Sequence, residues 1–386
     1  MKIAIYSTML SLHQTHVADE FYKICGDDFR FFELRKNADA QKASFVDITV
    51  RPYLVKVWEN DFARKEAMKW ALSADVARFS NDEAVFPYLK ARLNKNLLSF
   101  EVGERWLKRG IVNLLSPRLL RNVWHYHSLF RNKPFYKLCA SAYATNDQYL
   151  MGTFKGKCYK WGYFTKIENK IAPKGYDYSK RRKVSIMWCA RFLDWKHPEM
   201  VAMLARRLKD SGYNNIKIDM YGTGVEMTST QQYCHNLGVQ DFFCFKGNMP
   251  NEEILNAMRE HEIFLFTSDR KEGWGAVLNE AMSNGCAVVA SDEIGSVPFL
   301  VKDKVNGMVF KSKEMNSLYD KVVYLIEHPI ERSQMSIEAY LTMRDVWSPH
   351  KAALNFIQLS EDLMQGRETS IMEGPCSQAF PIKKLY

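Results

Sequence analysis

The chain has 386 residues, of which 47% are hydrophobic and 25% are charged, and its formal net charge is +10. This composition excludes an intrinsically disordered chain, and the length is sufficient for two domains of ordinary size. The excess of basic residues favours acidic partners, namely nucleoside diphosphates, anionic membrane surfaces or nucleic acids.

Eight cysteines are scattered along the chain without a C-x-x-C motif, a distribution typical of buried thiols in a reducing compartment. Met1-Lys2 leads directly into a predicted strand, so we expect no signal peptide. No apolar run approaches ~20 residues, so we expect no transmembrane helix. The sequence predicts a cytoplasmic protein, either free or peripheral on the inner face of the cell membrane.

Residues 1–165 alternate between strand-like and helical patterns, which predicts an N-terminal Rossmann-like domain with a largely parallel sheet. The first repeat of this pattern has a strand at 2–6, a loop at 7–13 and a helix at 14–24. No Gly-x-Gly-x-x-Gly sequence follows that strand, which argues against an NAD-type fingerprint. Further strands are expected at 29–32, 53–58, 74–80 and 96–100.

The segment 104–126 combines basic side chains with large apolar ones. Its basic residues are Arg105, Lys108, Arg109, Arg118 and Arg121. A basic amphipathic helix of this kind suits an anionic membrane surface. The alternative is that the apolar face packs on the sheet while the arginines are solvated, and the sequence leaves both open.

Residues 166–183 are polar and basic and contain Pro and Gly breakers, so we interpret them as a linker. A C-terminal Rossmann-like domain is predicted over 184–346. Residues 347–365 are predicted to form a helix that begins at a Ser-Pro pair. Residues 366–386 contain Gly, Pro and Ser without a period, and they predict a flexible tail.

Strands and helices alternate regularly in the second domain, which again predicts a parallel sheet. Strands are expected at 184–190, 216–221, 242–245, 263–266, 286–290 and 307–310. Helices are expected at 198–208, 226–237, 251–261, from near 276 to 284, at 314–328 and at 330–343.

The most informative stretch is Glu262 to Ser291, EIFLFTSDRKEGWGAVLNEAMSNGCAVVAS. A buried strand is followed by a polar turn, by Glu272 to Gly275, and by a helix that contains Glu280. The first amides of a helix lack intrahelical partners and carry the positive end of the dipole, so they favour an anion. Gly273 and Gly275 lack side chains and would let a phosphate approach closely.

Glu272 and Glu280 are about two helical turns apart, so both carboxylates can line one cleft. A carboxylate accepts hydrogen bonds from both hydroxyls of a vicinal diol. The alternative is that Glu272 caps the helix and Glu280 is solvated. The complete pattern of strand, Glu, Gly-aromatic-Gly, second Glu and strand favours an anion site with sugar recognition beside it.

The stretch EGWGAVLNEAMSNGCAVVAS resembles the E-x7-E signature of glycosyltransferase family 4, which comprises retaining nucleotide-sugar glycosyltransferases with the GT-B fold. One departure is Trp274, where the family more often has Phe. The resemblance implies an α/β architecture with two Rossmann-like domains, whose parallel sheets face each other across a cleft. It also implies that the C-terminal helix crosses back to pack on the first domain.

Arg191 and Lys196 follow the first strand of the second domain, in CARFLDWKHPE. Two cations at the carboxyl end of a strand could clamp a diphosphate, and the resemblance implies that role for both. It also implies that Glu280 holds the ribose and Glu272 the transferred sugar.

We therefore expect Glu272, Arg191 and Lys196 to act in catalysis. The predicted donor-binding residues are Gly273, Trp274, Gly275, Ala276, Glu280, Gly222, Gly224, Lys246 and Gly247. The last four end two strands, where the glycines are equally compatible with ordinary turns.

The resemblance implies that the first domain holds the acceptor. The family often has a glycine pair in the first loop, which STMLSLHQTH lacks, and His13 and His16 are its polar candidates. A His that the family often has after a middle strand is replaced here by Glu101, with Glu104 soon after. Either carboxylate could bind hydroxyls or act as a base. Further candidates after the preceding strand are Asn81 and Asp82.

The sequence thus predicts a retaining, hexosyltransferase-type glycosyltransferase. It would move a sugar from a nucleoside-diphosphate-sugar donor to a hydroxyl of a saccharide or lipid-linked saccharide. The resemblance alone implies a place in bacterial surface polysaccharide assembly, that is capsule, O-antigen or exopolysaccharide. Neither a metal, nor another cofactor, nor a nucleic acid partner is expected.

Two alternatives remain open. An inverting GT-B enzyme or a sugar-nucleotide epimerase would need a dedicated base in the first domain, and product stereochemistry would distinguish it. A catalytically silent nucleotide-sugar-binding or RNA-binding protein is the other alternative. The complete set of Glu272, Glu280, Arg191 and Lys196 argues against that second alternative.

Overall fold

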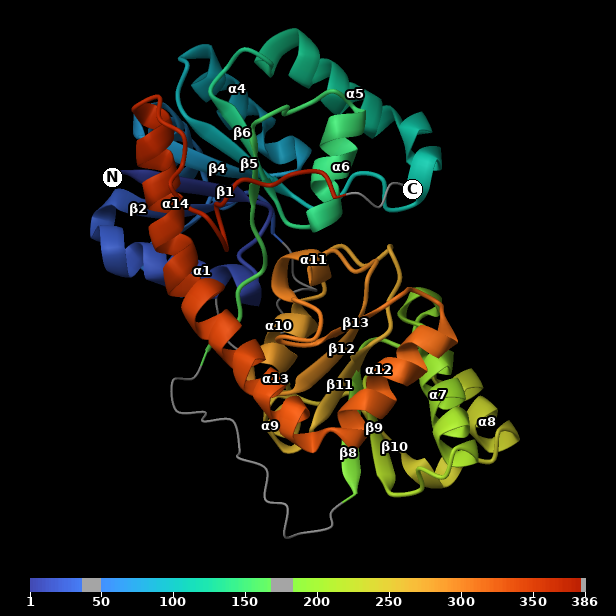
Figure 1. Cartoon of the computed structure of the whole chain (residues 1–386). Coiled ribbons are helices and arrows are strands. Elements are labelled where there is room, and N and C mark those ends of the chain that lie inside the picture. The colour runs from blue at the N-terminus through green and yellow to red at the C-terminus, as the bar shows by residue number, and fades with distance from the viewer. Residues whose placement is uncertain (37–49, 168–182, 383–386) are drawn as a thin grey trace. The chain divides into compact units, whose positions relative to one another are not determined.

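The computed structural model describes residues 1–36, 50–167 and 183–382, which form two compact units (Figure 1). Unit 1 comprises Met1–Lys166 and Val346–Tyr386, and unit 2 comprises Ile167–Asp345. The predicted linker at 166–183 lies almost entirely outside the described residues.

Unit 1 is built on a sheet of seven parallel strands in the order β3-β2-β1-β4-β5-β6-β7. The strands are β1 (Ile3–Ser7), β2 (Phe29–Glu33), β3 (Leu54–Lys56), β4 (Val76–Ser80), β5 (Ser99–Gly103), β6 (Phe135–Cys139) and β7 (Cys158–Lys160). The helices are α1 (Leu12–Cys25), α3 (Asp61–Ser73), α4 (Phe86–Asn94), α5 (Pro117–His125), α6 (Ala142–Leu150) and α14 (Pro349–Met364). Short 3₁₀ turns lie at Gly26–Asp28, Glu83–Val85 and Gly110–Leu115, and a π-helical turn lies at Tyr126–Phe130.

The central strands of unit 1 are nearly continuous apolar runs, as expected for a parallel sheet covered on both faces. Every residue of β1 is buried. The ring of Tyr6 stacks on Phe32 of β2 and on Phe79 of β4, with 4.9 Å between centroids in both pairs. Its hydroxyl donates to the carbonyl oxygen of Ala67 in α3 at 2.8 Å, so β1 is fixed to both neighbouring strands and to one helix layer.

Helix α14 returns to unit 1 and packs along α1, which confirms the predicted crossing of the C-terminal helix (Figure 1). Its Ser348 N-cap accepts a hydrogen bond from the Lys351 amide at 3.2 Å. Its Phe356 contacts Phe21 of α1 and Phe100 of β5, with ring centroids 5.4 and 5.1 Å apart. The helix therefore completes the core on one face of the first sheet.

The tail after α14 is packed, which differs from the flexible tail predicted over 366–386. Cys376 and Ala379 are buried, and backbone hydrogen bonds join the segment to β7. The Lys160 amide donates to Ser377 at 2.8 Å, and the Cys376 amide donates to Lys160 at 2.7 Å. Because β7 is an edge strand, its unpaired backbone groups can recruit this segment. Residues 383–386 lie outside the described residues.

The basic segment 104–126 does not form one amphipathic helix. It contains a 3₁₀ turn and then α5, which Pro117 begins. Arg105 is buried and pairs with the buried Asp147, whose other carboxylate oxygen accepts from the Leu107 amide at 2.8 Å. Arg105 is therefore a core residue of unit 1, and the segment is a helix of nine residues preceded by anchored loop.

Unit 2 has six parallel strands in the order β10-β9-β8-β11-β12-β13. The strands are β8 (Val184–Cys189), β9 (Ile216–Tyr221), β10 (Phe243–Gly247), β11 (Ile263–Phe266), β12 (Ala287–Ser291) and β13 (Met308–Phe310). The helices are α7 (Pro198–Asp210), α8 (Met227–Asn236), α9 (Asn251–Glu260), α10 (Ala276–Ser283), α11 (Val297–Leu300), α12 (Met315–Glu327) and α13 (Pro329–Leu341). Short 3₁₀ turns lie at Asp194–Lys196 and Gln240–Phe242, and a π-helical turn lies at Thr342–Val346.

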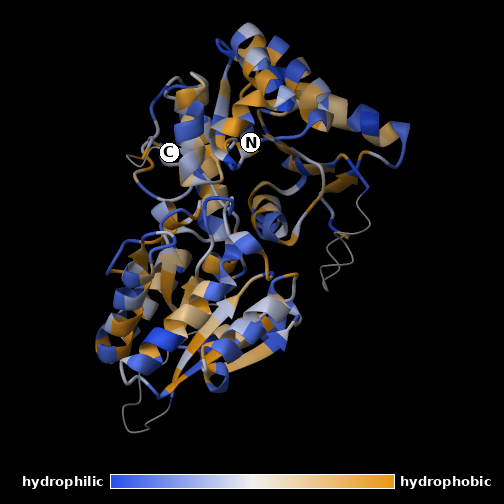
Figure 2. Cartoon of the chain, turned by 90° about the vertical axis from the view of Figure 1, so that its right-hand side faces the viewer, coloured by the Kyte–Doolittle hydropathy of each residue, from blue (hydrophilic) through white to orange (hydrophobic). Residues whose placement is uncertain are grey.

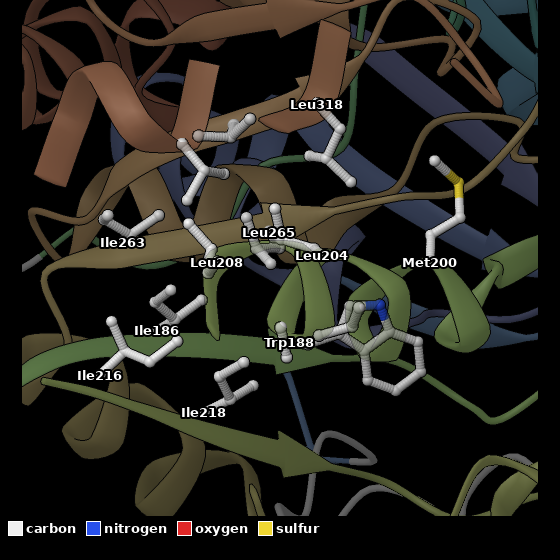
Figure 3. Close-up of a cluster of buried hydrophobic side chains, with 14 of the residues drawn as sticks. Ile186, Trp188, Met200, Leu204, Leu208, Ile216, Ile218, Ile263, Leu265 and Leu318 are labelled. Carbon is white, nitrogen blue, oxygen red and sulfur yellow. The ribbon is translucent and has the colours of Figure 1, made fainter. Parts of the chain in front are cut away.

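One hydrophobic cluster holds helices α7 and α12 on the second sheet. Leu204 of α7 and Leu318 of α12 lie over Ile186 and Leu265, all fully buried (Figure 3). Each such side chain stabilises the fold by about 1.5–3 kcal/mol relative to exposure. The helices carry hydrophilic residues beside hydrophobic ones (Figure 2), as amphipathic elements around a core should. The strand ends that carry the candidate site are thereby placed on a rigid base.

Removal of residues 367–386 should loosen the edge of the first sheet. We expect the Lys160 amide, which donates to Ser377, to exchange with solvent at least about tenfold faster, because its acceptor is lost. Hydrogen exchange resolved by residue is the measurement. The Lys137 amide, which donates to Lys157 at 2.9 Å, is the internal control. Equal protection of Lys160 in both proteins would contradict the packed tail.

Candidate active site

The strand order of both sheets is that of doubly wound folds, in which ligands bind where the order reverses. In unit 2 this switch point lies between β8 and β11, which are neighbours in the sheet. The loop after β8 spans residues 190–197, and the loop after β11 spans residues 267–275. Topology alone therefore brings the predicted cations and the predicted Glu-Gly-Trp-Gly turn together.

Lys196 and Glu272 form an ion pair between these two loops, from Nζ to Oε2. Their side chains are 11% and 15% exposed, so water screens the pair less than it screens a surface pair. Arg191 is exposed, and its guanidinium has no hydrogen bond or ion pair with any residue in the described part of the chain. One cation of the predicted clamp is thus neutralised within the protein, and the other is free to meet an anion.

Hydrogen bonds join the two loops beneath this ion pair. The Thr267 hydroxyl donates to the carbonyl oxygen of Lys196 at 2.6 Å and accepts from the Trp188 indole at 3.0 Å. The Asp269 amide donates to the carbonyl oxygen of Trp195 at 2.9 Å. The positions of Lys196 and Glu272 relative to each other are therefore set by buried bonds between the loops.

His197 adds a charged part to the same network. Its Nδ1 lies 2.8 Å from Glu199 and its Nε2 lies 3.3 Å from Asp269. Hydrogen bonds with Asp269 and Glu199 raise the pKa of His197 to about 9 against the effect of burial, so the imidazole is charged at neutral pH. Burial opposes ionisation of Asp269, but bonds with His197, the Lys271 amide and Lys313 outweigh it and lower its pKa to about 2.

The turn before α10 requires glycine at position 275 for two reasons. Gly275 has a φ of 85°, and a Cβ there would lie 2.4 Å from the Phe266 ring. It is the N-cap of α10, which begins at Ala276 as predicted, and Gly273 is buried beside it. No acidic side chain stands in the first turn. The positive end of the helix dipole is therefore available to a ligand anion.

Glu280 is buried within α10, so the alternative of a solvated surface residue is wrong. Burial raises its pKa to about 7, and a hydrogen bond from Asn251 opposes that effect. The Asn251 amide donates to Oε1 at 3.1 Å. Asn251, the first residue of α9, was not predicted, because nothing local to it signals this contact.

Gly222 and Gly224 serve the packing of two loops. A Cβ at Gly222 would lie 2.1 Å from the carbonyl oxygen of Ala190, and one at Gly224 would lie 2.3 Å from that of Phe192. Both glycines have positive φ. These glycines let the loop after β9 pack directly on the loop that carries Arg191, and their contact with a donor stays a prediction.

Lys246 and Gly247 end β10, beside the same loop. Lys246 is exposed. Gly247 has a φ of 69°, and its carbonyl oxygen accepts from the Gly222 amide at 2.7 Å. The end of β10 is therefore connected through the backbone to the loop after β9.

Trp274, one of the predicted donor-binding residues, has its side chain in the core. Its side chain is fully buried, and its indole nitrogen donates to Asn279 at 2.8 Å. The indole supports the turn from the core, so only the backbone of Trp274 is placed to meet a donor. An apolar aromatic between two glycines fits either arrangement, which is why the sequence did not distinguish them.

In unit 1 one group of predicted acceptor residues gathers around Tyr163. The His13 ring stacks on Tyr163 with 5.9 Å between centroids, and the Tyr163 hydroxyl donates to Glu104 at 2.7 Å. His16 lies on the same helix as His13, and burial and the charge of His13 lower its pKa to about 4. Tyr163 was not predicted, and it is the residue that brings His13 and Glu104 together.

The other predicted acceptor residues lie at the ends of β4 and β5. Glu101 accepts a hydrogen bond from Nζ of Lys137, whose side chain is fully buried. Asp82 caps a 3₁₀ turn through the Ala84 amide at 2.9 Å and pairs with Arg35 at 2.8 Å. Asn81, beside it, accepts a hydrogen bond from Arg118 through its carbonyl oxygen at 3.0 Å.

Arg78 is a further residue that the sequence analysis missed. It lies in β4 and is 3% exposed. Its guanidinium lies 5.7 Å from the centre of the Trp161 ring, and its Nε has no hydrogen-bond partner among the described residues. Burial lowers its pKa to about 10, so it is charged at neutral pH. The sequence signal for Arg78 is a basic residue inside an otherwise apolar predicted strand.

Comparison with known proteins places sequence similarity mainly in unit 2. Residues 177–342 match the family model of glycosyl transferases group 1. A poly(glycerol-phosphate) alpha-glucosyltransferase of Bacillus subtilis (strain 168) is 25% identical over 126 residues, which is 32% of this chain and 18% of that enzyme. The chain therefore corresponds to less than a fifth of that curated relative.

Solved structures resemble the whole chain. HepE of Anabaena, in complex with UDP, has a TM-score of 0.66 and 15% identity, covering 95% of this chain and 100% of that one. Sucrose-phosphate synthase of Thermosynechococcus elongatus has a TM-score of 0.65 and 13% identity, covering 94% and 99%. TarM of S. aureus, in complex with Fondaparinux, alpha-GlcNAc-glycerol and UDP, has a TM-score of 0.56 and 17% identity, covering 75% and 56%.

These likenesses agree with the two parallel sheets described above. The predicted fold class is thereby confirmed. The chain has the two Rossmann-like domains of the GT-B fold, and over residues 177–342 it is similar in sequence to the group 1 glycosyl transferases.

Proposed function

We propose that the protein is a retaining glycosyltransferase. It moves a sugar from a nucleoside-diphosphate-sugar donor to a hydroxyl of a saccharide or lipid-linked saccharide, in the assembly of a bacterial surface polysaccharide. The observation that carries the proposal is the convergence of Arg191, Lys196, Glu272 and the start of α10 at the switch point of unit 2. The presence of UDP in the HepE and TarM structures supports a nucleoside diphosphate as the donor group.

The donor diphosphate would lie at the start of α10, between the two cations. In the free protein Glu272 neutralises Lys196. A bound diphosphate would compete for Lys196 and release Glu272, whose oxygens could then accept hydrogen bonds from hydroxyls of the transferred sugar. The ion pair thus holds Lys196 and Glu272 in place until the donor binds, when Lys196 contacts the diphosphate and Glu272 the sugar.

Transfer requires stabilisation of the charge that develops on the leaving diphosphate. Arg191, Lys196 and the amides of α10 supply it, since preorganised donors aimed at developing charge are the largest catalytic contribution in many enzymes. The proposal includes no protein nucleophile and no metal ion. The leaving phosphate takes the acceptor proton on the same face of the sugar, which retains the anomeric configuration. The group around Tyr163 and the carboxylate of Glu101 are the acceptor-side candidates in unit 1.

A basic and apolar surface on unit 1 supports contact with an anionic membrane. No helix in the described part of the chain is long and apolar enough to span a bilayer. Around α5, Leu115 and Trp124 are 80% and 61% exposed, beside the exposed Arg118 and Arg121. Such a face can insert its apolar side chains at the interface while the arginines meet anionic headgroups.

Alanine at Lys196 or at Arg191 should each lower kcat/KM by about 2–4 kcal/mol of transition-state stabilisation, a factor of roughly 30 to 1,000. Steady-state kinetics with a nucleotide-sugar panel is the measurement. Lys313→Ala is the control, because Lys313 reaches Asp269 from the same crevice without belonging to the clamp. A variant at Lys196 or Arg191 with unchanged turnover would reject the clamp for that residue.

Glu280→Gln should stabilise the free protein while weakening nucleotide binding. Burial raises the folded-state pKa from 4.5 to about 7, so the native state binds more protons between these values and loses stability as pH rises through them. Above pH 7 the ionised Glu280 carboxylate lowers the free energy of unfolding by about 3 kcal/mol. The stability of the variant relative to wild type should therefore rise from pH 4.5 to pH 7 and then level off.

Urea unfolding between pH 4.5 and 8 measures the stability part, and calorimetry with UDP measures the binding part. Glu272→Gln is the matched substitution, and it should spare UDP affinity while lowering turnover. If Glu272→Gln lost UDP binding and Glu280→Gln kept it, the roles assigned to the two carboxylates would be exchanged.

Charge reversal at Arg118 should weaken membrane binding. We expect the full-length protein to sediment with anionic vesicles at low salt, to release at high salt, and to bind about fivefold less as Arg118→Glu, since each basic residue near the surface contributes about 1 kcal/mol. Arg206→Glu in unit 2 is the control for net charge. If all three proteins bound equally to neutral and anionic vesicles, the proposed membrane contact would be rejected and the basic face would be a solvated surface.

A further inference from the structure

Unit 1 contains a cavity of about 320 Å³ that the proposed donor chemistry does not use. It lies between the start of α4 and the helix α5, and it reaches the ends of β4 and β5. Its volume is at the lower end of the range for sites that bind small molecules. The cavity is formed entirely by residues of unit 1.

The deep wall of the cavity is aromatic. Tyr126, Phe130, Phe135 and Phe154 all line it, and each is at most 5% exposed. Ring centroids of Tyr126 and Phe154 lie 4.4 Å apart, those of Phe135 and Phe154 lie 5.1 Å apart, and those of Phe130 and Phe135 lie 5.7 Å apart. A cavity with such a wall favours an apolar occupant over ordered water.

Two irregular backbone features build this wall. Phe154 has a φ of 49°, a conformation that is costly for a bulky residue and is found where surroundings enforce it. Tyr126 and Phe130 are the two ends of the π-helical turn that continues α5. Turns of this kind often occur at functional sites. Both irregularities point aromatic rings at one cavity.

The part of the cavity near the ends of β4 and β5 contains polar atoms that lack partners. The indole nitrogen of Trp106 and the hydroxyl of Ser80 are buried and have no hydrogen-bond partner among the described residues. Glu101, which also lines this part, uses Oε1 to accept from Lys137 and keeps Oε2 without a partner in the described part of the chain. One donor, one hydroxyl and one acceptor are therefore available to a ligand that carries hydroxyl groups.

Three carboxylates, of Asp82, Glu83 and Glu101, and two guanidinium groups, of Arg118 and Arg121, line the cavity. Glu83 pairs with Arg121, and Glu101 pairs with Lys137. Asp82 pairs with Arg35 at 2.8 Å. Arg118 donates to the carbonyl oxygen of Asn81 at 3.0 Å and has no carboxylate partner among the described residues. Because the lining carboxylates outnumber the lining guanidinium groups, the cavity disfavours an anionic head group. A neutral, hydroxylated head fits this arrangement better than a phosphate.

We propose that the cavity binds an amphiphile that has an uncharged, hydroxylated head and one apolar tail. The tail lies against the aromatic wall, and the head meets Trp106, Ser80 and Glu101. Identification of this ligand with the sugar acceptor rests on the proposed function, whereas the binding itself does not. The site would then select an acceptor by its lipid part as well as by its sugar.

The test measures binding of alkyl glucosides to the full-length protein by calorimetry, below their micelle concentrations. Kd should fall about fourfold for each added methylene, since each buried methylene contributes about 0.8 kcal/mol, so octyl glucoside should bind about fifteenfold tighter than hexyl glucoside. Octanol, which lacks the head, and octyl phosphate, which carries a charged one, should both bind more weakly than octyl glucoside.

Trp106→Phe removes the unpartnered N–H and keeps an aromatic ring. It should therefore weaken the binding of octyl glucoside about three- to tenfold and leave the binding of octanol unchanged. Ser80→Ala should act in the same direction and serves if the Trp106 variant fails to fold. Trp58→Phe is the matched control, because Trp58 follows β3 in the same unit and does not line the cavity. This control variant should change neither the affinity for octyl glucoside nor the affinity for octanol.

Three results would overturn the proposal. They are equal binding of methyl and octyl glucoside, equal effects of Trp106→Phe and Trp58→Phe, and tighter binding of octyl phosphate than of octyl glucoside. Titration of the same samples with a panel of nucleoside diphosphates that includes UDP reports separately on unit 2. Failure to bind any of them would reject the proposed glycosyl transfer without affecting the cavity, and loss of chain-length dependence would do the reverse.

Discussion

The hydrogen bonds between the loops after β8 and β11 are the constraint on which the candidate active site depends. All strands of a parallel sheet end at the same edge. At a switch point, however, the chain continues from two neighbouring strands into different helices. The bonds from Thr267 to Lys196 and from Asp269 to Trp195 hold those loops together. Gly222 and Gly224 extend the arrangement, because only glycine lets the loop after β9 approach the backbone of Ala190 and Phe192. Three strand ends thus act as one platform.

Charge in this platform is distributed mostly in matched pairs, and Arg191 and Glu280 are exceptions. Lys196 is balanced by Glu272, and His197 is balanced by Asp269 and Glu199. Glu280 has only the neutral Asn251 amide, within a buried helix. Groups with strongly shifted pKa values gather at functional sites more often than elsewhere. Burial of the Glu280 carboxylate therefore opposes the stability of unit 2 directly. Hydrogen bonds from a hydroxylated ligand would offset this cost.

Local pattern was sufficient to predict most elements, whereas partners that come from distant segments were not predictable. The strand at 263–266, the helix that begins at Ala276 and the helix that begins at Pro349 agree with the structure because apolar runs, glycines and Ser-Pro starts are local signals. The burial of Trp274, the contact of Asn251 with Glu280 and the ion pair of Arg105 with Asp147 depend on segments that meet only in the fold. The packed tail has the same origin, because its composition carries no sign that an edge strand will bind it.

The return of α14 to unit 1 imposes an order on how the chain can fold during translation. Unit 2 is one continuous segment, but unit 1 needs both chain ends. Until Phe356 leaves the ribosome, the surfaces of Phe21 and Phe100 that it covers have no partner. At 5–20 residues per second, synthesis from residue 166 to residue 356 takes about 10–40 s. For that interval the nascent first unit exposes an apolar face, which makes it a substrate for chaperones at a stage when unit 2 can already close its own core.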